Sequence, residues 1–246
     1  MIRAVVIVMH DKIAELKELI SKSRRIVFFT GAGLSTESAI PDFRGSAGLN
    51  KEKTPYPLEV MLSHSFFVQH PDEFYAFYHQ HMLYPQAQPN AAHLKIAELE
   101  RQGQVLAVIT QNIDDLHTKA GSKRVYELHG NVNRNYCVRC HHFYDLAAIV
   151  KQPGIPYCSC GGIIKPDVVL YEEALDEKTL LAAVQAIRSA DCLIVVGSSL
   201  SVYPASGLLR YFQGKHLVII NRDPTDYDQF AEIVLHESAG FVLTQV

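Results

Sequence analysis

The stretch TGAGLSTESAIPDFRG occupies residues 30–45 and directly follows an apolar run, IVFF, at residues 26–29. A buried strand that ends in Gly-Ala-Gly can turn sharply and bring its backbone close to a pyrophosphate, whose negative charge then meets the free N–H groups at the start of the next helix. The same Gly-x-Gly turn also occurs in ordinary strand-turn-helix connections. The stretch therefore predicts an α/β fold and a candidate nucleotide-binding loop at residues 31–33.

The second half of this stretch carries three functional side chains on a predicted loop. Pro41 and Gly45 bracket Asp42, Phe43 and Arg44, so an acid, an aromatic ring and a guanidinium lie on a segment unsuited to a helix interior. We expect these three side chains to line a ligand site. Asp42 also fits a second interpretation, as the cap of a turn.

Apolar periodicity predicts that helices and buried strands alternate along most of the chain. The predicted helices cover residues 11–21, 90–102, 177–189 and 206–212, and the predicted strands cover residues 25–30, 104–110, 191–197 and 217–221. Continuous apolar strands separated by helices indicate a parallel sheet that is covered on both faces. The predicted fold class is therefore α/β, with a Rossmann-like parallel sheet domain.

Two stretches interrupt this alternation and predict a second, smaller domain. Residues 46–89 are rich in aromatic and His residues and are interpreted as a helical insertion, whereas residues 131–165 are rich in Cys and Gly and are interpreted as a zinc-binding module. The Rossmann-like domain would then consist of residues 1–45, 90–130 and 166–246.

Paired cysteines in the second of these stretches predict a structural zinc site. They are Cys137, Cys140, Cys158 and Cys160, with 17 residues between the two pairs. This two-knuckle spacing lets four thiolates close a tetrahedron around the metal and leave no open position for chemistry. Two alternatives stay open, a site in which His141 or His142 replaces a cysteine, and a set of free thiols.

Further motifs follow in a fixed order along the chain. Residues 111–114 read QNID directly after an apolar run, residues 128–131 read LHGN, and residues 197–200 read GSSL. Together with GAGLS, PDFR and the paired cysteines, these motifs make the chain resemble the sirtuin family of NAD-dependent protein deacylases. The resemblance covers nearly everything from about residue 11 to the C-terminus.

This resemblance implies a protein-lysine deacetylase that uses NAD as co-substrate. Such an enzyme transfers the acetyl group from acetyl-lysine to ADP-ribose and releases nicotinamide, which is then both a product and an expected inhibitor. The partners implied are proteins or peptides that contain acetyl-lysine, and one structural zinc ion per chain is implied as well.

The resemblance also implies catalytic roles for three polar residues. His129 would be the base that deprotonates a ribose hydroxyl, since an imidazole titrates near neutrality and Gly130 lets the backbone lie close to the ligand. Asn112 and Asp114 both follow a strand's carboxyl end, where doubly wound sheets bind ligands. The resemblance implies that Asn112 positions the ribose and that Asp114 recognises the nicotinamide amide. Without the resemblance, His129 fits a structural histidine bound to a carbonyl, and Asp114 fits a cap.

The residues expected to contact NAD come from several separate segments. By the same mapping they are Gly31, Ala32, Gly33, Thr36, Asp42, Phe43, Arg44, Gln111, Ile113, Asp114, His129, Gly197, Ser198, Ser199, Asn221 and Glu237. In the absence of the family pattern, Ser198 and Ser199 would form an ordinary hydroxyl-rich loop.

Two segments resemble those between which sirtuins hold an extended peptide by strand addition. They are residues 165–171 (KPDVVLY) and residues 201–204 (SVYP). Backbone pairing of this kind tolerates many sequences, which predicts broad acceptance of peptides. The chain departs from the commoner family pattern at Ala39 and Glu172, where sirtuins more often have Gly. Both departures add a side chain at a predicted turn, so they bear on loop conformation more than on the reaction.

A pair of tyrosines bears on which acyl group is removed. Sirtuins that remove acidic acyl groups share a Tyr-x-x-Arg pair in the helical insertion, where the guanidinium binds the distal carboxylate. In this chain Tyr75 matches the tyrosine, but Tyr78 stands where the arginine would be. A phenol offers one neutral hydrogen bond in place of a charged bidentate clamp. We therefore expect acetyl to be preferred over succinyl or malonyl, unless His79 or His81 supplies a cation.

Composition and the N-terminal sequence limit the partners and the location. Lys and Arg number 23 against 26 Asp and Glu, a formal net charge of -3, which gives no case for sequence-independent nucleic-acid binding. No specific nucleic-acid partner is predicted. No stretch approaches the roughly 20 apolar residues of a membrane span, and the apolar run at residues 4–9 is too short for a signal peptide. The sequence predicts a cytoplasmic protein without a membrane partner. Met9 is a candidate natural start, with a loose extension ahead of it.

Three other functions compete with the deacetylase. A dehydrogenase would need G-x-G-x-x-G with an acid about 20 residues later, whereas here the PDFR segment and an insertion take that place. A zinc-ribbon binding module without catalysis would leave the QNID motif and His129 unexplained. A protein mono-ADP-ribosyltransferase uses the same NAD chemistry and stays the alternative function.

Overall fold

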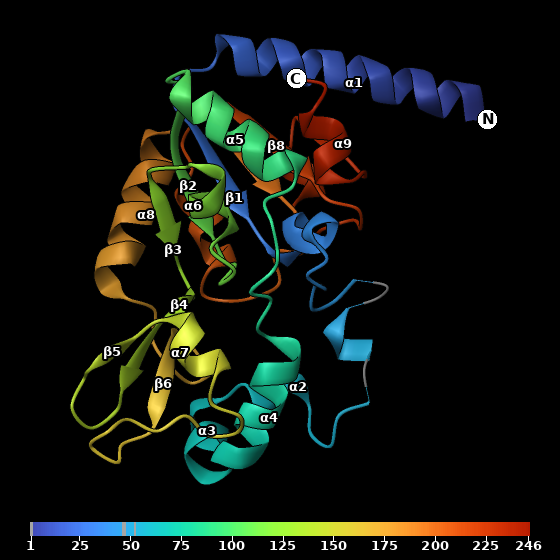
Figure 1. Ribbon diagram of the computed structural model, residues 1–246. Coiled ribbons are helices and arrows are strands. Elements are labelled where there is room, and N and C mark those ends of the chain that lie inside the picture. The colour runs from blue at the N-terminus through green and yellow to red at the C-terminus, as the bar shows by residue number, and fades with distance from the viewer. Residues whose placement is uncertain (1, 46–47, 52) are drawn as a thin grey trace.

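The large lobe of the molecule is built on a parallel sheet. The computed structural model describes residues 2–45, 48–51 and 53–246, the first seven of these by their backbone alone. Within them, six parallel strands form a sheet in the order β3 (Val125–Glu127), β2 (Val105–Thr110), β1 (Ile26–Thr30), β7 (Cys192–Val196), β8 (His216–Ile220) and β9 (Ile233–Leu235) (Figure 1). Renumbered within the sheet, this is the 3-2-1-4-5-6 order of Rossmann folds.

Helices cover both faces of this sheet. They are α1 (Ile2–Lys22), α5 (Ala91–Arg101) and α9 (Ala239–Leu243) on one face and α8 (Glu177–Ser189) with the 3-10 helix η3 (Ser206–Tyr211) on the other. Successive side chains of a strand point to opposite faces. Ile26 and Phe28 of β1 therefore pack on the first set and Val27 and Phe29 on the second, and all four are fully buried. Burial on both faces explains why the central strands read as continuous apolar runs.

The small lobe combines an antiparallel sheet with short helices. Its described part holds strands β5 (Phe143–Tyr144), β4 (Gly130–Cys137) and β6 (Ile164–Val168), with helices α2 (Leu58–Met61), α3 (His64–Gln69), α4 (Pro71–His81) and α7 (Leu146–Val150). The helices α2 to α4 and the sheet share one apolar core, in which Phe67 and Phe74 pack together with Val132 and Ile164. The two stretches that interrupt the alternation in the sequence thus meet in one lobe below the large sheet (Figure 1).

Most of the predicted elements of the large lobe are present, with differences at their ends. The predicted helix at residues 177–189 coincides with α8, and the predicted strands at residues 25–30, 104–110, 191–197 and 217–221 match β1, β2, β7 and β8 to within a residue or two. The helix expected at residues 206–212 is the 3-10 helix η3. The helix predicted to follow the Gly-Ala-Gly turn is also a 3-10 helix, η1 (Ala32–Ser38).

Other differences lie at the N-terminus and at the edges of the large sheet. Helix α1 begins at Ile2, so the segment ahead of Met9 is helical and the expectation of a loose extension is wrong for residues 2–8. The edge strands β3 and β9, of three residues each, were not predicted. Met1 and the start of the predicted insertion at residue 46 lie outside the described residues, and the domain boundaries stay a prediction.

None of the described helices combines the length and apolarity that a bilayer crossing requires.

The predicted metal-binding cysteines converge on one point of the small lobe. Among the described residues, the Sγ atoms of Cys137, Cys140, Cys158 and Cys160 all lie within 4.8 Å of one another. The Cys137–Cys160 and Cys140–Cys158 Sγ pairs are 3.4 and 3.5 Å apart, and no disulfide joins these four cysteines. Four Zn–S bonds of about 2.3 Å in a tetrahedron separate the sulfurs by roughly 3.8 Å. The four thiolates are therefore placed to hold one zinc ion, and neither His141 nor His142 belongs to the group.

A buried histidine pair lies beneath the first loop of the large sheet. The rings of His93 and His117 meet edge to face with their centroids 4.9 Å apart, and the two side chains are almost entirely shielded from solvent. His117 Nε2 lies 3.0 Å from Thr30 Oγ1 at the end of β1. His93 Nε2 and His117 Nδ1 have no hydrogen-bond partner in the described part of the chain. Burial lowers the pKa of His93 from 6.5 to about 4 and holds the pKa of His117 well below 6.5, so the pair is neutral in the folded state.

Removal of one cysteine of the cluster should release the metal and loosen the small lobe. We expect Cys160→Ala to lower bound zinc well below one ion per chain and to lower the Tm by at least about 5 °C, because metal binding and folding are linked. Elemental analysis and thermal unfolding measure the two effects. Cys192→Ala is the matched control, since Cys192 is a buried cysteine of β7 outside the cluster and its variant should keep the zinc. Unchanged metal content and Tm in Cys160→Ala would contradict the assignment.

The histidine pair predicts that acid destabilises the fold. The unfolded chain binds protons at these histidines near pH 6.5, whereas the folded chain resists protonation down to about pH 4 at His93, so stability is retained above pH 6.5 and lost as the pH falls through this window. The loss between pH 7.5 and pH 5 should be about 2 kcal/mol for His93 alone. Urea unfolding across this range measures it.

The control for this pH effect is the double variant His93→Asn, His117→Gln. It keeps a polar atom near His93 Nδ1 and near His117 Nε2, the two ring nitrogens that have partners. We expect the free energy of unfolding of this variant to depend less on pH than that of wild type. The variant retains the cysteine cluster, so any loss of zinc in acid should affect both proteins equally. Equal slopes in wild type and variant would assign the acid sensitivity to other groups.

Candidate functional site

Two loops meet at the point of the large sheet where the strand order reverses. The loop after β1 donates from Gly33 N to Gly197 O over 2.8 Å, and Gly197 belongs to the loop after the neighbouring strand β7. A Cβ on Gly33 would lie 2.9 Å from that oxygen, and a Cβ on Gly197 would lie 2.1 Å from the nitrogen of Leu34. The glycines are therefore required because the two loops touch, a reason that the sequence-based argument from pyrophosphate approach did not contain.

A cavity of about 690 Å³ opens beside this contact, between the two lobes. Rossmann-like sheets bind their ligands at this edge, outside the carboxyl ends of the strands at the switch point. The predicted residues that line it are Gly31, Ala32, Gly33, Asp42, Phe43, Arg44, Gln111, Asn112, Ile113, Asp114, His129, Gly197, Ser198, Ser199 and Asn221. The fold thus brings together residues that are up to 190 positions apart in the sequence (Asn221 and Gly31).

Thr36 and Glu237 are the two predicted cofactor-binding residues that do not line this cavity. Thr36 Oγ1 donates to Gly33 O over 3.0 Å, within the first loop. The Glu237 carboxylate accepts from the N–H of Ser238 over 2.9 Å, close to the start of α9. Both side chains therefore have local partners that suit a structural role in the loops.

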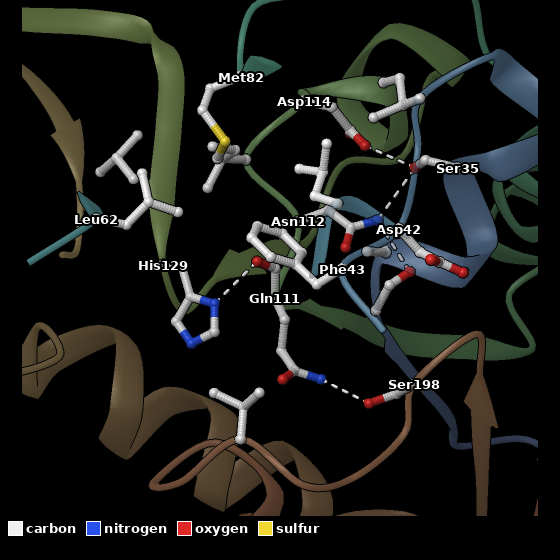
Figure 2. A pocket seen from close by; sticks show the side chains of 18 of the residues that line it. Ser35, Asp42, Phe43, Leu62, Met82, Gln111, Asn112, Asp114, His129 and Ser198 are labelled. Atoms are coloured by element: carbon white, nitrogen blue, oxygen red, sulfur yellow. Dashed lines mark hydrogen bonds between the residues drawn. The ribbon is translucent and has the colours of Figure 1, made fainter. Parts of the chain in front are cut away.

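A short hydrogen-bond network joins the loop after β1 to the loop after β2. Asn112 Nδ2 donates to Gly31 O and to Ser35 Oγ, over 3.1 Å in each case, and Ser35 Oγ donates to Asp114 Oδ2 over 2.6 Å (Figure 2). No donor in the described part of the chain reaches Asn112 Oδ1. Asn112 is thus fixed through its amide nitrogen, while its amide oxygen is available to a ligand.

Ser35, the centre of this network, was not among the predicted site residues. Its side chain is buried, and it connects two residues that lie 77 and 79 positions further along the chain. The motif GAGLS contains Ser35, but nothing local in the sequence distinguishes a serine that bridges two loops from one that caps a helix. The missing signal is a long-range contact.

The carboxyl group of Asp114 lies in a largely dry part of the cavity. Burial raises its pKa, and hydrogen bonds from Ser35 Oγ and from the N–H of Leu116 offset part of this effect. The Leu116 bond is 2.9 Å long and closes a local turn, as the capping interpretation of Asp114 predicted. Asp114 therefore combines a capping bond with a position on the cavity wall.

The hydrogen bond of His129 determines which ring nitrogen can act as a base. His129 Nδ1 lies 2.9 Å from the backbone oxygen of Gln111 (Figure 2). A carbonyl oxygen can only accept, so Nδ1 carries the proton and Nε2 of the neutral ring carries the lone pair. Burial lowers the pKa of His129, and the bond to Gln111 O offsets part of this effect. The ring is therefore neutral at pH 7, with a basic nitrogen that is not engaged by Gln111.

Gly130 is required for a reason that the sequence did not indicate. Its φ is 79°, a left-handed conformation that favours glycine, and a Cβ at this position would lie 1.9 Å from Asp167 O of β6. The glycine makes room for a neighbouring strand of the small sheet.

Other predicted residues of the cavity wall hold each other in place. Gln111 Nε2 donates to Ser198 Oγ over 2.9 Å, and Ser199 Oγ lies 2.8 Å from Ser201 Oγ. Asn221 Nδ2 donates to Asp223 O over 2.7 Å. The loops after β2, β7 and β8 are therefore ordered by their own side chains along the edge of the cavity.

The PDFR segment lines the cavity and also forms a turn. Asp42 Oδ1 accepts from the N–H of Gly45 over 2.9 Å, so the turn-capping interpretation of Asp42 is correct in addition to its place on the wall. Arg44 approaches Glu59 of α2 at 3.7 Å. Phe43 packs against the apolar core of the small lobe. The segment therefore spans the gap between the two lobes.

An apolar part of the cavity, lined by Leu62, Tyr78 and Met82 and called the apolar passage below, leads from the region of His129 into the helices of the small lobe. Leu62 and Met82 lie on the side of the cavity opposite to Ser35 and Asp114 (Figure 2). Tyr78 also lines the cavity, its side chain is almost fully buried, and its hydroxyl has no partner among the residues that the structure describes.

The neighbouring tyrosine and histidine are turned to other partners. The Tyr75 hydroxyl donates to the backbone oxygen of Ile164, and His79 Nε2 lies 3.2 Å from Gly154 O. Neither residue is part of the cavity lining, whereas His81 is. Burial raises the pKa of both Tyr75 and Tyr78, which keeps the phenols neutral.

Comparison with known proteins agrees with this geometry. The Sir2 family model matches residues 31–204. Proteins named NAD-dependent protein deacetylase are similar over nearly the full length: the one from Clostridium acetobutylicum is 54% identical over 96% of this chain and 98% of its own, and one from Staphylococcus aureus is 46% identical over 93% and 95%.

Solved structures give the same result. A Sir2 variant with deacetylated p53 peptide and 3'-O-acetyl ADP-ribose superimposes with a TM-score of 0.88 at 40% identity, covering 95% of this chain and 96% of that one. A Sir2 protein with p53 peptide and NAD gives a TM-score of 0.83 at 40% identity, over 94% and 95%. With a family model across most of its length and relatives above half identity, the chain belongs to the Sir2 family.

Proposed function

We infer that this protein is an NAD-dependent protein-lysine deacetylase, which transfers the acetyl group of acetyl-lysine to ADP-ribose and releases nicotinamide. The observation that carries this inference is the neutral imidazole of His129, whose Nε2 lone pair shares one cavity with the Asn112 and Asp114 network and with an apolar passage. The activity named for its relatives at 45% to 54% identity supports it.

The cavity fits NAD as the co-substrate. The loops after β1 and β7 suit its phosphates, since Gly31, Ala32 and Gly33 line the cavity without bulky side chains and Ser198 and Ser199 supply hydroxyls. Asp42, Phe43 and Arg44 would cover it from the small lobe, and the Asn112 amide oxygen, which has no donor among the described residues, would accept from a ribose hydroxyl. When bound, NAD supplies a glycosidic bond whose cleavage leaves positive charge on the ribose, where an acetyl oxygen can attack.

The remaining polar groups would then act around the ribose and the nicotinamide. His129 Nε2 would accept a proton from a ribose hydroxyl, as a neutral imidazole can do at pH 7. The carboxyl group of Asp114, in its dry surroundings, would bind the nicotinamide amide. Nicotinamide is then a product that can return to its site and inhibit.

The acyl-lysine would enter through the apolar passage lined by Leu62 and Met82, whose apolar side chains would exclude water from the reacting atoms. Solved Sir2 structures with acetylated and propionylated peptides support this assignment.

We do not favour mono-ADP-ribosyl transfer, because the relatives carry the deacetylase name. A zinc-binding cluster of cysteines without disulfides suits a reducing compartment such as the cytoplasm.

Loss of the base should abolish turnover after the first bond is broken. His129→Ala is expected to lower NAD-dependent release of free lysine by about two to four orders of magnitude, with little change in the Tm. Mass spectrometry of an acetyl-lysine peptide, with and without NAD, follows lysine, nicotinamide and acetyl-ADP-ribose. The control is His10→Ala, an exposed histidine of α1, which should behave as wild type. Nicotinamide exchange should persist in His129→Ala, and near wild-type deacetylation in it would overturn the mechanism.

The passage should discriminate against acidic acyl groups. A succinyl carboxylate would lie near Tyr78, whose phenol offers one neutral hydrogen bond, while Tyr75 and His79 contact backbone oxygens elsewhere and only His81 of the two histidines lines the cavity. Burying a carboxylate that pairs with the Tyr78 phenol and not with His81 costs several kcal/mol, so we expect kcat/KM on a succinyl-lysine peptide at least about 100-fold below that on the matched acetyl peptide. In Tyr78→Arg, kcat/KM on the succinyl-lysine peptide should move closer to kcat/KM on the acetyl-lysine peptide. Equal turnover of both peptides by wild type would refute the expected selectivity.

A further inference from the structure

Glu172 lies in an unusual backbone conformation beside the cavity. It belongs to the segment that leads from β6 towards α8, and it lines the cavity together with Leu170 and Tyr171. Its φ is 76°, in the left-handed region that side chains other than Gly and Asn rarely adopt. A residue that carries a side chain is held in such a conformation only where its surroundings compensate for the strain.

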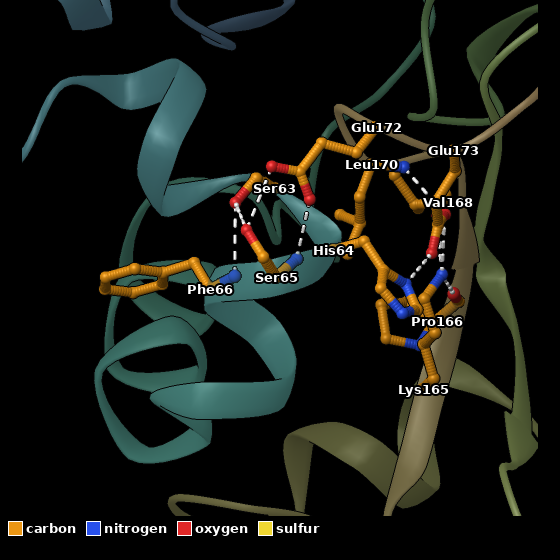
Figure 3. Close-up of polar contacts among 10 residues, drawn as sticks. All are labelled: Ser63, His64, Ser65, Phe66, Lys165, Pro166, Val168, Leu170, Glu172 and Glu173. Carbon is orange, nitrogen blue, oxygen red and sulfur yellow. Dashed lines mark hydrogen bonds and ion pairs between the residues drawn. The ribbon is translucent and has the colours of Figure 1, made fainter.

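The compensation comes from the Glu172 carboxylate. One of its oxygens accepts from the N–H of Ser65 and the other from Ser65 Oγ, both over 2.9 Å (Figure 3). Ser65 lies in the first turn of α3, whose N-cap Ser63 accepts from the N–H of Phe66 over 3.1 Å. The carboxylate thus connects the cavity wall to a helix of the small lobe that lies 107 residues earlier in the chain.

The backbone of the same segment is attached to the start of α3 and to Leu62, the C-cap of α2. Tyr171 N donates to Leu62 O and His64 N donates to Tyr171 O, each over 3.0 Å, and Ser63 and Tyr171 form a parallel bridge. Leu62 is itself part of the apolar passage. A shift of Tyr171 would therefore be passed on to the wall of that passage.

A second carboxylate fixes the other side of the segment. Glu173 accepts from the N–H of Leu170 over 2.9 Å and from Lys165 Nζ over 3.1 Å, and it pairs with His64 Nδ1 at 2.8 Å (Figure 3). Glu172 and Glu173 together hold residues 170–173 to both β6 and α3. The difference between them is that Glu172 makes its contacts to Ser65 from a left-handed backbone.

We propose that Glu172 is a positioning residue for the acyl-peptide, which keeps residues 170–172 pressed against α3 so that the peptide meets a strand that is already in place. This proposal rests on the proposed deacetylase function. A segment ordered in advance does not lose conformational entropy when the peptide adds to it, so its contribution appears in peptide binding and not in the chemical step. Glycine at this position would leave the segment free of the Ser65 tether.

Glu172→Gly tests the tether without adding backbone strain. We expect the KM for an acetyl-lysine peptide to rise about fivefold or more, while kcat and the KM for NAD stay within about twofold, because two hydrogen bonds to a charged acceptor are lost. Glu172→Ala should raise the peptide KM at least as much and lower the Tm further, since it keeps the strain. Glu172→Gln retains acceptor oxygen and should recover most of the peptide affinity, and Ser65→Ala should give a partial loss.

Two controls separate this role from a general effect on the fold. Ala39→Gly makes the same exchange at another left-handed position, where φ is 60°, and should leave the peptide KM unchanged. Fluorescence anisotropy with a labelled acetyl peptide gives the Kd without turnover, so the tether can be judged even if wild type fails to deacetylate, a result that would refute the proposed function alone. An unchanged peptide Kd in Glu172→Gly and Glu172→Ala, or an equal loss in kcat and in the KM for NAD, would overturn the proposal.

Discussion

The molecule depends on one close contact, the hydrogen bond from Gly33 N to Gly197 O at the point where the strand order of the large sheet reverses. The loops after β1 and β7 are so near each other there that no side chain fits between them. Several polar groups of the cavity are placed by the loops that this contact joins or by their neighbours. Asn112 donates to Gly31 O, Ser35 follows two residues after Gly33, and Gln111 reaches Ser198 on the adjoining loop. A displacement of either loop would therefore disturb the whole network at once.

Much of the large lobe could be predicted from the sequence because its strands are buried on both faces. The residues of β1, β2, β7 and β8 form nearly continuous apolar runs, which is the pattern expected of strands buried on both faces and not of strands with one exposed face. The edge strands β3 and β9 are only three residues long, which gives periodicity too little to act on. The helix expected after the Gly-Ala-Gly turn is the 3-10 helix η1, which ends at Ser38, and its C-cap Ala39 is left-handed. Local propensity does not report this conformation of the cap.

The site was predictable where a residue type is specific to a motif and not where its role depends on a distant partner. His129, Asn112, Asp114 and the four cysteines stand in motifs, and the fold brings them to the expected places, although their chemical roles stay proposals. Ser35 acts between loops that are far apart in the sequence. In the sequence, Glu172 stands out only as a departure from the more common glycine. Its contact with Ser65 could not be predicted, because Ser65 lies in α3, 107 residues earlier in the chain.

His129 also occupies the junction between the two sheets. Only Leu128 and His129 separate β3 of the large sheet from β4 of the small one. The ring donates to Gln111 O in the large lobe, while the His129 carbonyl accepts from Val169 N in the segment that continues β6. A rotation of the small lobe about these two residues would leave the imidazole at the pivot, where displacement is smallest. A small displacement of one lobe relative to the other would thus move His129 less than the cavity residues that lie farther from this junction.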